Sequence, residues 1–379
     1  MIHQGLTWDH PRGYAALAAA AEQATAEGRP VVAWSKQPLE GFESHPIADL
    51  AARFDLLVLD HPHIGEAVDS DCLVPLEDLF AADEIAAWSA RTVGPAMASY
   101  DWDGRHYALP LDVATQVMAL RPDLAGAPPA TFDDVVRLAE KAPVAVSVSG
   151  PHALCSFFSI CVSLGEEPRG EALIGDATAS EALSILSRLS AAAPPGTATL
   201  NPIRLLETMA TGDAIALVPL VYGYVNYARP AGGRHRVAFA DAPVARAGGR
   251  HGSVLGGTGI AVTKRAKPDT ALIDHLRWLM SEVAQAGFIP DHEGQPSARA
   301  AWRSERVNAA AGDFYRATLA TVEEAWVRPR HNGYIAFQTA GSAILRETIL
   351  DGAPPSATIA RLRDAWARSF VHAPTGAGG

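Results

Sequence analysis

The feature that most constrains the fold is an almost wholly apolar segment, Phe54–Asp60, which reads FDLLVLD and ends in an acid. A strand without polar alternation is typical of a parallel sheet that is covered on both faces. Two earlier strands are predicted at Ile2–Trp8 and Pro30–Trp34, with helices between the strands over Arg12–Ala26 and Pro46–Arg53. This β-α-β-α-β order predicts an α/β fold with right-handed crossovers.

Acids and imidazoles follow two of these strands. The segment Asp9–Pro11 comes after the first strand, and Asp60–His63 comes after the third. Ligands of open α/β sheets bind at the carboxyl ends of strands, so the two segments are expected to form two walls of one site. We expect Asp9 to cap the helix that follows it. Arg12 is in the first turn, where the helix dipole disfavours a cation, and this favours a contact with a ligand anion.

Composition limits the classes of function. The 379 residues suffice for two domains, and a net charge of −11 disfavours a nucleic-acid partner. Three cysteines without a CxxC spacing argue against a disulfide framework or a zinc ribbon. No apolar run has the length of a membrane span. The N-terminus has no signal-peptide pattern, which leaves two expectations open: a cytoplasmic protein with a native Met1, or a trimmed periplasmic or extracellular one.

Further elements are predicted along the chain. Ala108–Ala119 is extended, and Thr131 is the expected N-cap of the next helix. A strand is predicted at Val144–Val148, and a glycine turn that runs into a strand at Gly256–Thr263. The tail, 373–379, is expected to be disordered.

Five segment groups, in this order, resemble one known family. They are FDLLVLD with LVPLEDL (54–60 and 73–79), DGRHYALPLD with LRPDL (103–112 and 120–124), PPATFDD (128–134), MATGDAIA (209–216), and GGTGIAV with GQPS (256–262 and 294–297). The set is similar to the type II extracellular solute-binding proteins of ABC transporters, in the branch that binds maltose and other sugars. The resemblance covers nearly the whole chain.

The resemblance implies a two-lobed α/β fold of the type II periplasmic-binding-protein kind, with a multi-strand hinge. Lobe one would contain 1–112 and 255–302, and lobe two 113–254 and 303–372. A monomer would close its lobes on a small polar ligand, a carbohydrate or an organic anion, and deliver the ligand to an ABC permease. No cofactor and no metal is implied.

Polar and aromatic residues near the predicted cleft are the candidate ligand-binding set. These are Trp8, His10, Arg12, Trp34, Lys36, Asp60, His61, His63, Asp112, Gln116, Tyr222, Tyr224, Asn226, Gly257, Thr258, Glu293 and Gln295. Trp8 and Trp34 could equally be packing residues. Two alternatives stay open because imidazoles can act as acid, base or metal ligand: a cytoplasmic enzyme on the same scaffold, and an iron- or zinc-binding protein.

Overall fold

The computed structural model describes residues 1–229 and 232–370. The tail predicted to be disordered, 373–379, lies outside these residues. Within them, no helix is both long enough and apolar enough to cross a membrane.

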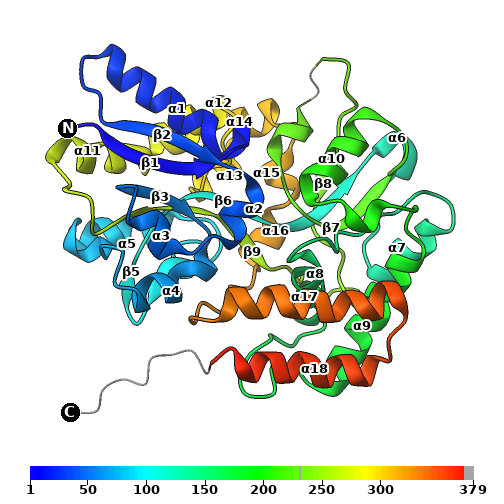
Figure 1. The fold of residues 1–379 in the computed structure, drawn as a ribbon. Coiled ribbons are helices and arrows are strands. Elements are labelled where there is room, and N and C mark those ends of the chain that lie inside the picture. Colours follow the sequence, from blue (N-terminus) through cyan, green and yellow to red (C-terminus); the bar gives the residue numbers. More distant parts are fainter. Residues whose placement is uncertain (230–231, 371–379) are drawn as a thin grey trace, which may run out of the picture.

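One mixed sheet runs through the molecule in the strand order β2-β1-β3-β9-β6-β7, with β8 also paired to β6 (Figure 1). Its strands are β1 (His3–Trp8), β2 (Val32–Gln37), β3 (Leu56–Leu59), β6 (Leu109–Leu120), β7 (Leu217–Tyr222), β8 (Ala238–Ala240) and β9 (Leu255–Val262). A separate hairpin pairs β4 (Asp101–Trp102) with β5 (Arg105–His106). The parallel arrangement predicted for the first three strands is confirmed, because β1 pairs in parallel with both β2 and β3.

The elements form two α/β lobes, as predicted, which lie side by side in Figure 1. Around β1–β3 lie α1 (Pro11–Ala26), α2 (Leu39–Ser44), α3 (Ile47–Ala51), α4 (Ile64–Asp69), α5 (Ala82–Arg91) and α11 (Thr270–Leu279). Around β7 and β8 lie α6 (Pro122–Ala125), α7 (Phe132–Ala139), α8 (His152–Ser163), α9 (Asp176–Ala191) and α10 (Pro202–Thr211).

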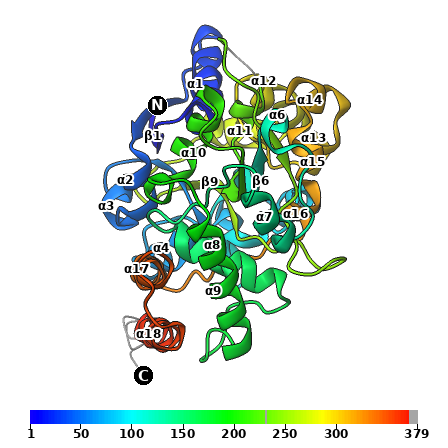
Figure 2. The ribbon, with the colours of Figure 1, turned by 90° about the vertical axis from the view of Figure 1, so that its right-hand side faces the viewer.

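The C-terminal third is helical. Short helices follow the sheet: α12 (Ile289–Asp291), α13 (Arg299–Arg303), α14 (Glu305–Ala310), α15 (Phe314–Ala317) and α16 (Leu319–Glu323). The last two, α17 (Tyr334–Asp351) and α18 (Pro355–Arg368), pack against each other, and Figure 2 shows them nearly end on. Helix α17 also contacts α8 and α9, so the end of the chain covers the second lobe.

One long strand, β6, connects the lobes. The first part of β6, from Leu109 to Thr115, pairs with β9 beside β3. Its second part, from Gln116 to Leu120, pairs with β7 and β8. A single continuous strand therefore belongs to both halves of the sheet, which is the geometry that a multi-strand hinge requires.

Two local predictions had different outcomes. Thr131 does cap α7: its Oγ1 accepts from the Asp134 N–H, and the Asp134 carboxylate accepts from the Thr131 N–H. The strand predicted at Val144–Val148 is wrong, because only Val144 forms a bridge, to Leu217, and the rest is irregular chain. The segment is apolar because it is buried, not because it is paired.

Candidate functional site

The first Asp-His-Pro segment forms the start of α1. His10 is the N-cap residue, and its Nδ1 atom accepts a hydrogen bond from the Arg12 backbone N–H at 3.1 Å. The prediction that Asp9 caps this helix was therefore wrong; Asp9 pairs with Lys36, with 2.6 Å between Oδ1 and Nζ. Burial, assisted by the charge of Arg12, lowers the pKa of His10 to about 4. The imidazole is thus neutral near pH 7 and can act as a cap acceptor.

The Arg12 side chain reaches inward to a carboxylate. Its Nε donates to Asp112 Oδ2 at 2.8 Å, Nη2 donates to Oδ1, and Nη1 donates to the Gly223 carbonyl at 3.0 Å. The two side chains are only 4% and 5% exposed, and the guanidinium also lies 4.7 Å from the Tyr224 ring centroid. This bidentate pair holds β6, α1 and the chain after β7 together. The anion that Arg12 contacts in the structure is therefore Asp112.

The second Asp-His-Pro segment is organised by a distant arginine. Asp60 Oδ1 accepts from the His61 N–H at 2.8 Å, and Oδ2 is 2.5 Å from Arg328 Nη2. Arg328 also donates to the carbonyl of Leu255 and to Gln338. Burial alone would raise the pKa of Asp60, but Arg328 and His61 hold it well below its usual range. Burial lowers the pKa of His61 to about 4, so this imidazole is neutral as well.

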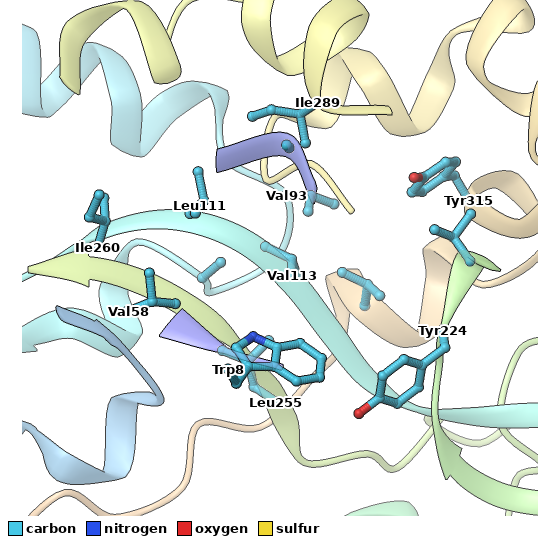
Figure 3. Packing of buried hydrophobic residues seen from close by; sticks show 14 of the residues in the cluster. Trp8, Val58, Val93, Leu111, Val113, Tyr224, Leu255, Ile260, Ile289 and Tyr315 are labelled. Atoms are coloured by element: carbon cyan, nitrogen blue, oxygen red, sulfur yellow. The ribbon is translucent and has the colours of Figure 1, made fainter. Parts of the chain in front are cut away.

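Aromatic rings from both lobes meet next to these polar groups. The Trp8 ring at the end of β1 lies 5.8 Å from Phe42 and 6.0 Å from Tyr224, measured between centroids. Figure 3 shows Trp8 and Tyr224 coming from different segments and facing each other beside β6. Gly13 allows this position of Trp8, because a Cβ on Gly13 would lie 2.1 Å from the indole Nε1. The aromatic wall is therefore built by β1, α2 and the segment after β7.

The start of β9 forms the floor. Gly257 has a φ of +102°, and a Cβ there would lie 2.3 Å from the Asp112 carbonyl oxygen, so the close approach of β9 to β6 requires glycine. Gly256 faces the ring of Tyr222 in a similar way. The hydroxyl of the neighbouring Thr258 is buried and has no hydrogen-bond partner among the described residues.

Side chains from these elements enclose a cavity of about 60 Å³ between the lobes. Seven predicted residues line it: Trp8, Arg12, Asp60, Tyr222, Tyr224, Gly257 and Thr258. Sequence reasoning missed or discounted the other lining residues, which are Leu39, Phe42, Glu43, Ala114, His152, Pro202 and Gly256. Their buried rings and polar atoms make a site that can stack on a small molecule and bond to its hydroxyl groups.

Helix α2 contributes three lining residues that the sequence did not predict, Leu39, Phe42 and Glu43. It begins at Leu39, two residues after β2 ends at Gln37, so the rule that ligands gather where strands end could have found it. Glu43 lies at 3.8 Å from His152, measured between Oε1 and Nε2, and its side chain is 26% exposed. Burial raises the pKa of Glu43 to about 7, with a further rise from Asp60 that Arg328 opposes.

The remaining predicted residues do not line the cavity. Trp34 packs over Gly5 on the sheet, and Gln116 bonds to Ser156 and Ser159 of α8. The other predicted residues that do not line the cavity are His10, Lys36, His61, His63, Asp112, Asn226, Glu293 and Gln295.

Three of them connect chain segments. Asn226 Nδ2 donates to Glu293 Oε2 at 2.9 Å, and Gln295 Nε2 donates to the Val113 carbonyl at 2.7 Å. Gln295 Oε1 also accepts from the Val225 N–H. These bonds join the loop before α13 to β6 and to the segment after β7. His63, by contrast, precedes α4 directly, and its Nδ1 atom is 3.6 Å from Glu66 Oε2 of that helix.

A metal site finds no support in the geometry. In residues 1–229 and 232–370, no group of three or more His, Cys, Asp or Glu side chains is arranged to hold a metal ion. That alternative depended on His10, His61 and His63, of which His10 and His61 use one ring nitrogen each within their own segments.

Comparison with known proteins gives a consistent result. Residues 16–312 match the family described as bacterial extracellular solute-binding protein. A search of curated protein sequences finds no match.

Solved structures extend the similarity to nearly the whole chain. A ribitol complex of an ABC transporter solute-binding protein from Agrobacterium radiobacter is 20% identical, with a TM-score of 0.80 and coverage of 98% of this chain and 99% of that one. Maltose-bound MalE3 of T. maritima is 17% identical, with a TM-score of 0.79 and coverage of 96% and 98%. UgpB from Mycobacterium tuberculosis, bound to glycerophosphocholine, is 17% identical, with a TM-score of 0.76 and coverage of 98% and 99%.

Proposed function

Because the chain belongs to the bacterial extracellular solute-binding proteins, we propose that it binds a small hydroxyl-rich molecule, a sugar or a polyol, between its two lobes. The observation that carries this proposal is the cavity where β1, α2, β9 and the segment after β7 converge. Its aromatic rings suit the apolar face of a sugar, and its carboxylates and hydroxyl suit the polar edge.

The relatives support this ligand class. Two of the similar structures are named for complexes with ribitol and maltose, and a third for glycerophosphocholine, which all carry hydroxyl groups. A cavity of about 60 Å³ has room for only a few water molecules. Binding a sugar therefore requires the lobes to separate and then close around it.

We propose that closure takes place at the strands shared by both lobes. In this assignment lobe one contains 1–112 and 255–302, and lobe two contains 113–254 and 303–372. Gly257 lies at the boundary, where its close contact with β6 fixes the two strands against each other. Hinge closure of this kind needs little rearrangement within each lobe.

The family match supports a proposal about the partner and the location. We propose that the protein acts as a monomer outside the cytoplasm and transfers its ligand to an ABC permease. The family match supports this function over an enzyme, and His10 and His61 each use one ring nitrogen within their own segments.

The test is ligand binding by a matched pair of variants. We expect at least one sugar or polyol in a thermal-shift panel to raise Tm by mass action. For that ligand, Thr258→Val removes an unpartnered hydroxyl in the cavity while keeping the side-chain shape, so Kd measured by calorimetry should rise about five- to tenfold. The control is Thr339→Val, an exposed threonine on α17.

Small-angle scattering supplies the second readout. The radius of gyration should decrease when the ligand is added, because the lobes close. If no sugar or polyol, substituted derivatives included, raises Tm, or if binding leaves the radius of gyration unchanged, the proposed function is refuted.

A further inference from the structure

The charges of the side chains around the cavity do not sum to zero. Arg12 is matched by Asp112, and Arg328 is matched by Asp60, each within hydrogen-bond distance. Glu43 is the remaining charge among the described residues that line the cavity. With both pairs neutral, the site as a whole carries the negative charge of one carboxylate when Glu43 is ionised.

No cation of the described chain compensates Glu43. Its carboxylate forms no ion pair with a lysine or arginine there, and its nearest basic group is the His152 ring at 3.8 Å. Burial lowers the pKa of His152 to about 3, so this imidazole is neutral and brings no positive charge. The His152 Nδ1 atom is itself buried without a partner in the described residues.

Glu43 borders two neighbouring cavities. It lines the inner cavity and also a second, outer cavity of about 350 Å³, which is bounded by Leu39, Glu40, His152, Asn201 and Arg204. The outer cavity contains one arginine, Arg204, but that side chain forms no ion pair with Glu43 within the described residues. The carboxylate therefore borders both cavities.

The surroundings of Glu43 favour a cation. Phe42, Trp8, Tyr222 and Tyr224 line the same cavity, and the faces of aromatic rings attract positive charge. A partly desolvated carboxylate gains more from a bound cation than an exposed one does, because the local dielectric is lower. The hydroxyl of Thr258, still without a partner, can accept from an N–H or an O–H group.

We propose that the ligand carries a protonated amino group and that Glu43 binds this group. The inference rests on the proposed function and narrows its ligand class to amino sugars and amino polyols. Glu43 supplies the charge, the aromatic rings cover the carbon skeleton, and Thr258 with Asp60 bonds the hydroxyl groups. Burial, together with the charge of Asp60, raises the pKa of Glu43 to about 7, and a bound cation would lower that pKa.

The experiment compares neutral compounds with their amino counterparts at pH 8. Sorbitol is paired with glucamine, and ribitol with ribitylamine, first by thermal shift and then by calorimetry on the compounds that bind. We expect the amine of at least one pair to bind about tenfold or more tightly than its parent, the effect of one charge-assisted hydrogen bond. Glu43→Gln should reduce this preference to less than twofold.

The matched control is Glu40→Gln. Glu40 is exposed on the same helix and borders only the outer cavity, so the amine preference should persist in that variant. The proposal is overturned if the parent polyol binds as tightly as the amine, or if the preference survives in Glu43→Gln. Binding of neutral compounds alone overturns this inference but leaves the proposed function intact, whereas failure of sugars, polyols and amines alike overturns both.

Discussion

The buried Arg12–Asp112 pair provides the most direct test of how the segments beside the cavity are held together. Replacing Asp112 with Asn removes the negative charge and keeps the side-chain shape, so the Arg12 charge is left buried without a counter-ion. The two side chains are 4% and 5% exposed, which leaves little access for water. Removing one partner of such a buried pair lowers the free energy of unfolding by about 3–5 kcal/mol.

The same structure predicts a smaller cost when both charges are removed. Arg12→Met with Asp112→Leu leaves no uncompensated charge and replaces the pair with apolar groups. The double variant still loses the bond to the Gly223 carbonyl, which is worth about 1 kcal/mol, and the contact with Tyr224. We therefore expect it to be destabilised by about 1–2 kcal/mol, less than either single variant.

Urea unfolding followed by circular dichroism, with equal m values required, measures these differences. For 379 residues the entropy of unfolding is about 0.8 kcal/mol/K, so 3–5 kcal/mol corresponds to a fall in Tm of about 4–6 °C. The reasoning is refuted if Asp112→Asn costs less than about 1 kcal/mol, or if the double variant is as unstable as the sum of the two single variants.

Three further predictions follow from single positions. Gly257→Ala should cost about 2 kcal/mol or more in urea unfolding, because its φ of +102° and the 2.3 Å approach to the Asp112 carbonyl oxygen leave no room for a Cβ; a cost below 0.5 kcal/mol would contradict the geometry. Glu43 has a pKa of about 7 in the folded chain against an ordinary 4.5. Its ionisation therefore destabilises the folded state: the loss in the free energy of unfolding is absent below pH 4.5, grows as pH rises, and reaches about 3 kcal/mol above pH 7. Glu43→Gln should therefore be more stable than the parent by about that amount in urea unfolding at pH 8, with no difference at pH 4, and an equal gain at both pH values would disprove the assignment. Gly13→Ala should displace the Trp8 indole and raise ligand Kd at least fivefold by calorimetry; an unchanged Kd would show that Trp8 does not contribute to the site.

The sequence was most informative where a pattern is local. Parallel pairing of β1 with β2 and β3 followed from short apolar strands separated by helices. Thr131 could be predicted as a cap because the backbone N–H that its side chain accepts from belongs to Asp134, only three residues further along the chain. By contrast, Val144–Val148 has the composition of a strand but pairs at one residue only, because burial alone selects apolar side chains.

Contacts between distant residues could not be predicted in this way. Asp60 and Arg328 are separated by 268 residues, and no local spacing indicates that they meet. Glu43 is an ordinary acid on a six-residue helix, and its importance comes only from what the other lobe places beside it. A cleft between two lobes is formed by contacts between residues that are far apart in the sequence. A sequence pattern can therefore indicate one wall of the cleft, but not the net charge of the residues that line it.

The two Asp-His-Pro segments show how burial decides the meaning of a motif. Imidazoles next to acids suggested acid–base chemistry or metal binding, because a histidine in water titrates near pH 7. In the structure burial lowers the pKa of both His10 and His61 to about 4, and each ring bonds within its own segment. The same desolvation acts in the opposite direction on Glu43, since burial disfavours the charged form of every group. The group in this cleft that titrates near neutral pH is therefore a carboxylate on α2, and a pH dependence of ligand affinity should follow Glu43 and persist when His61 is replaced.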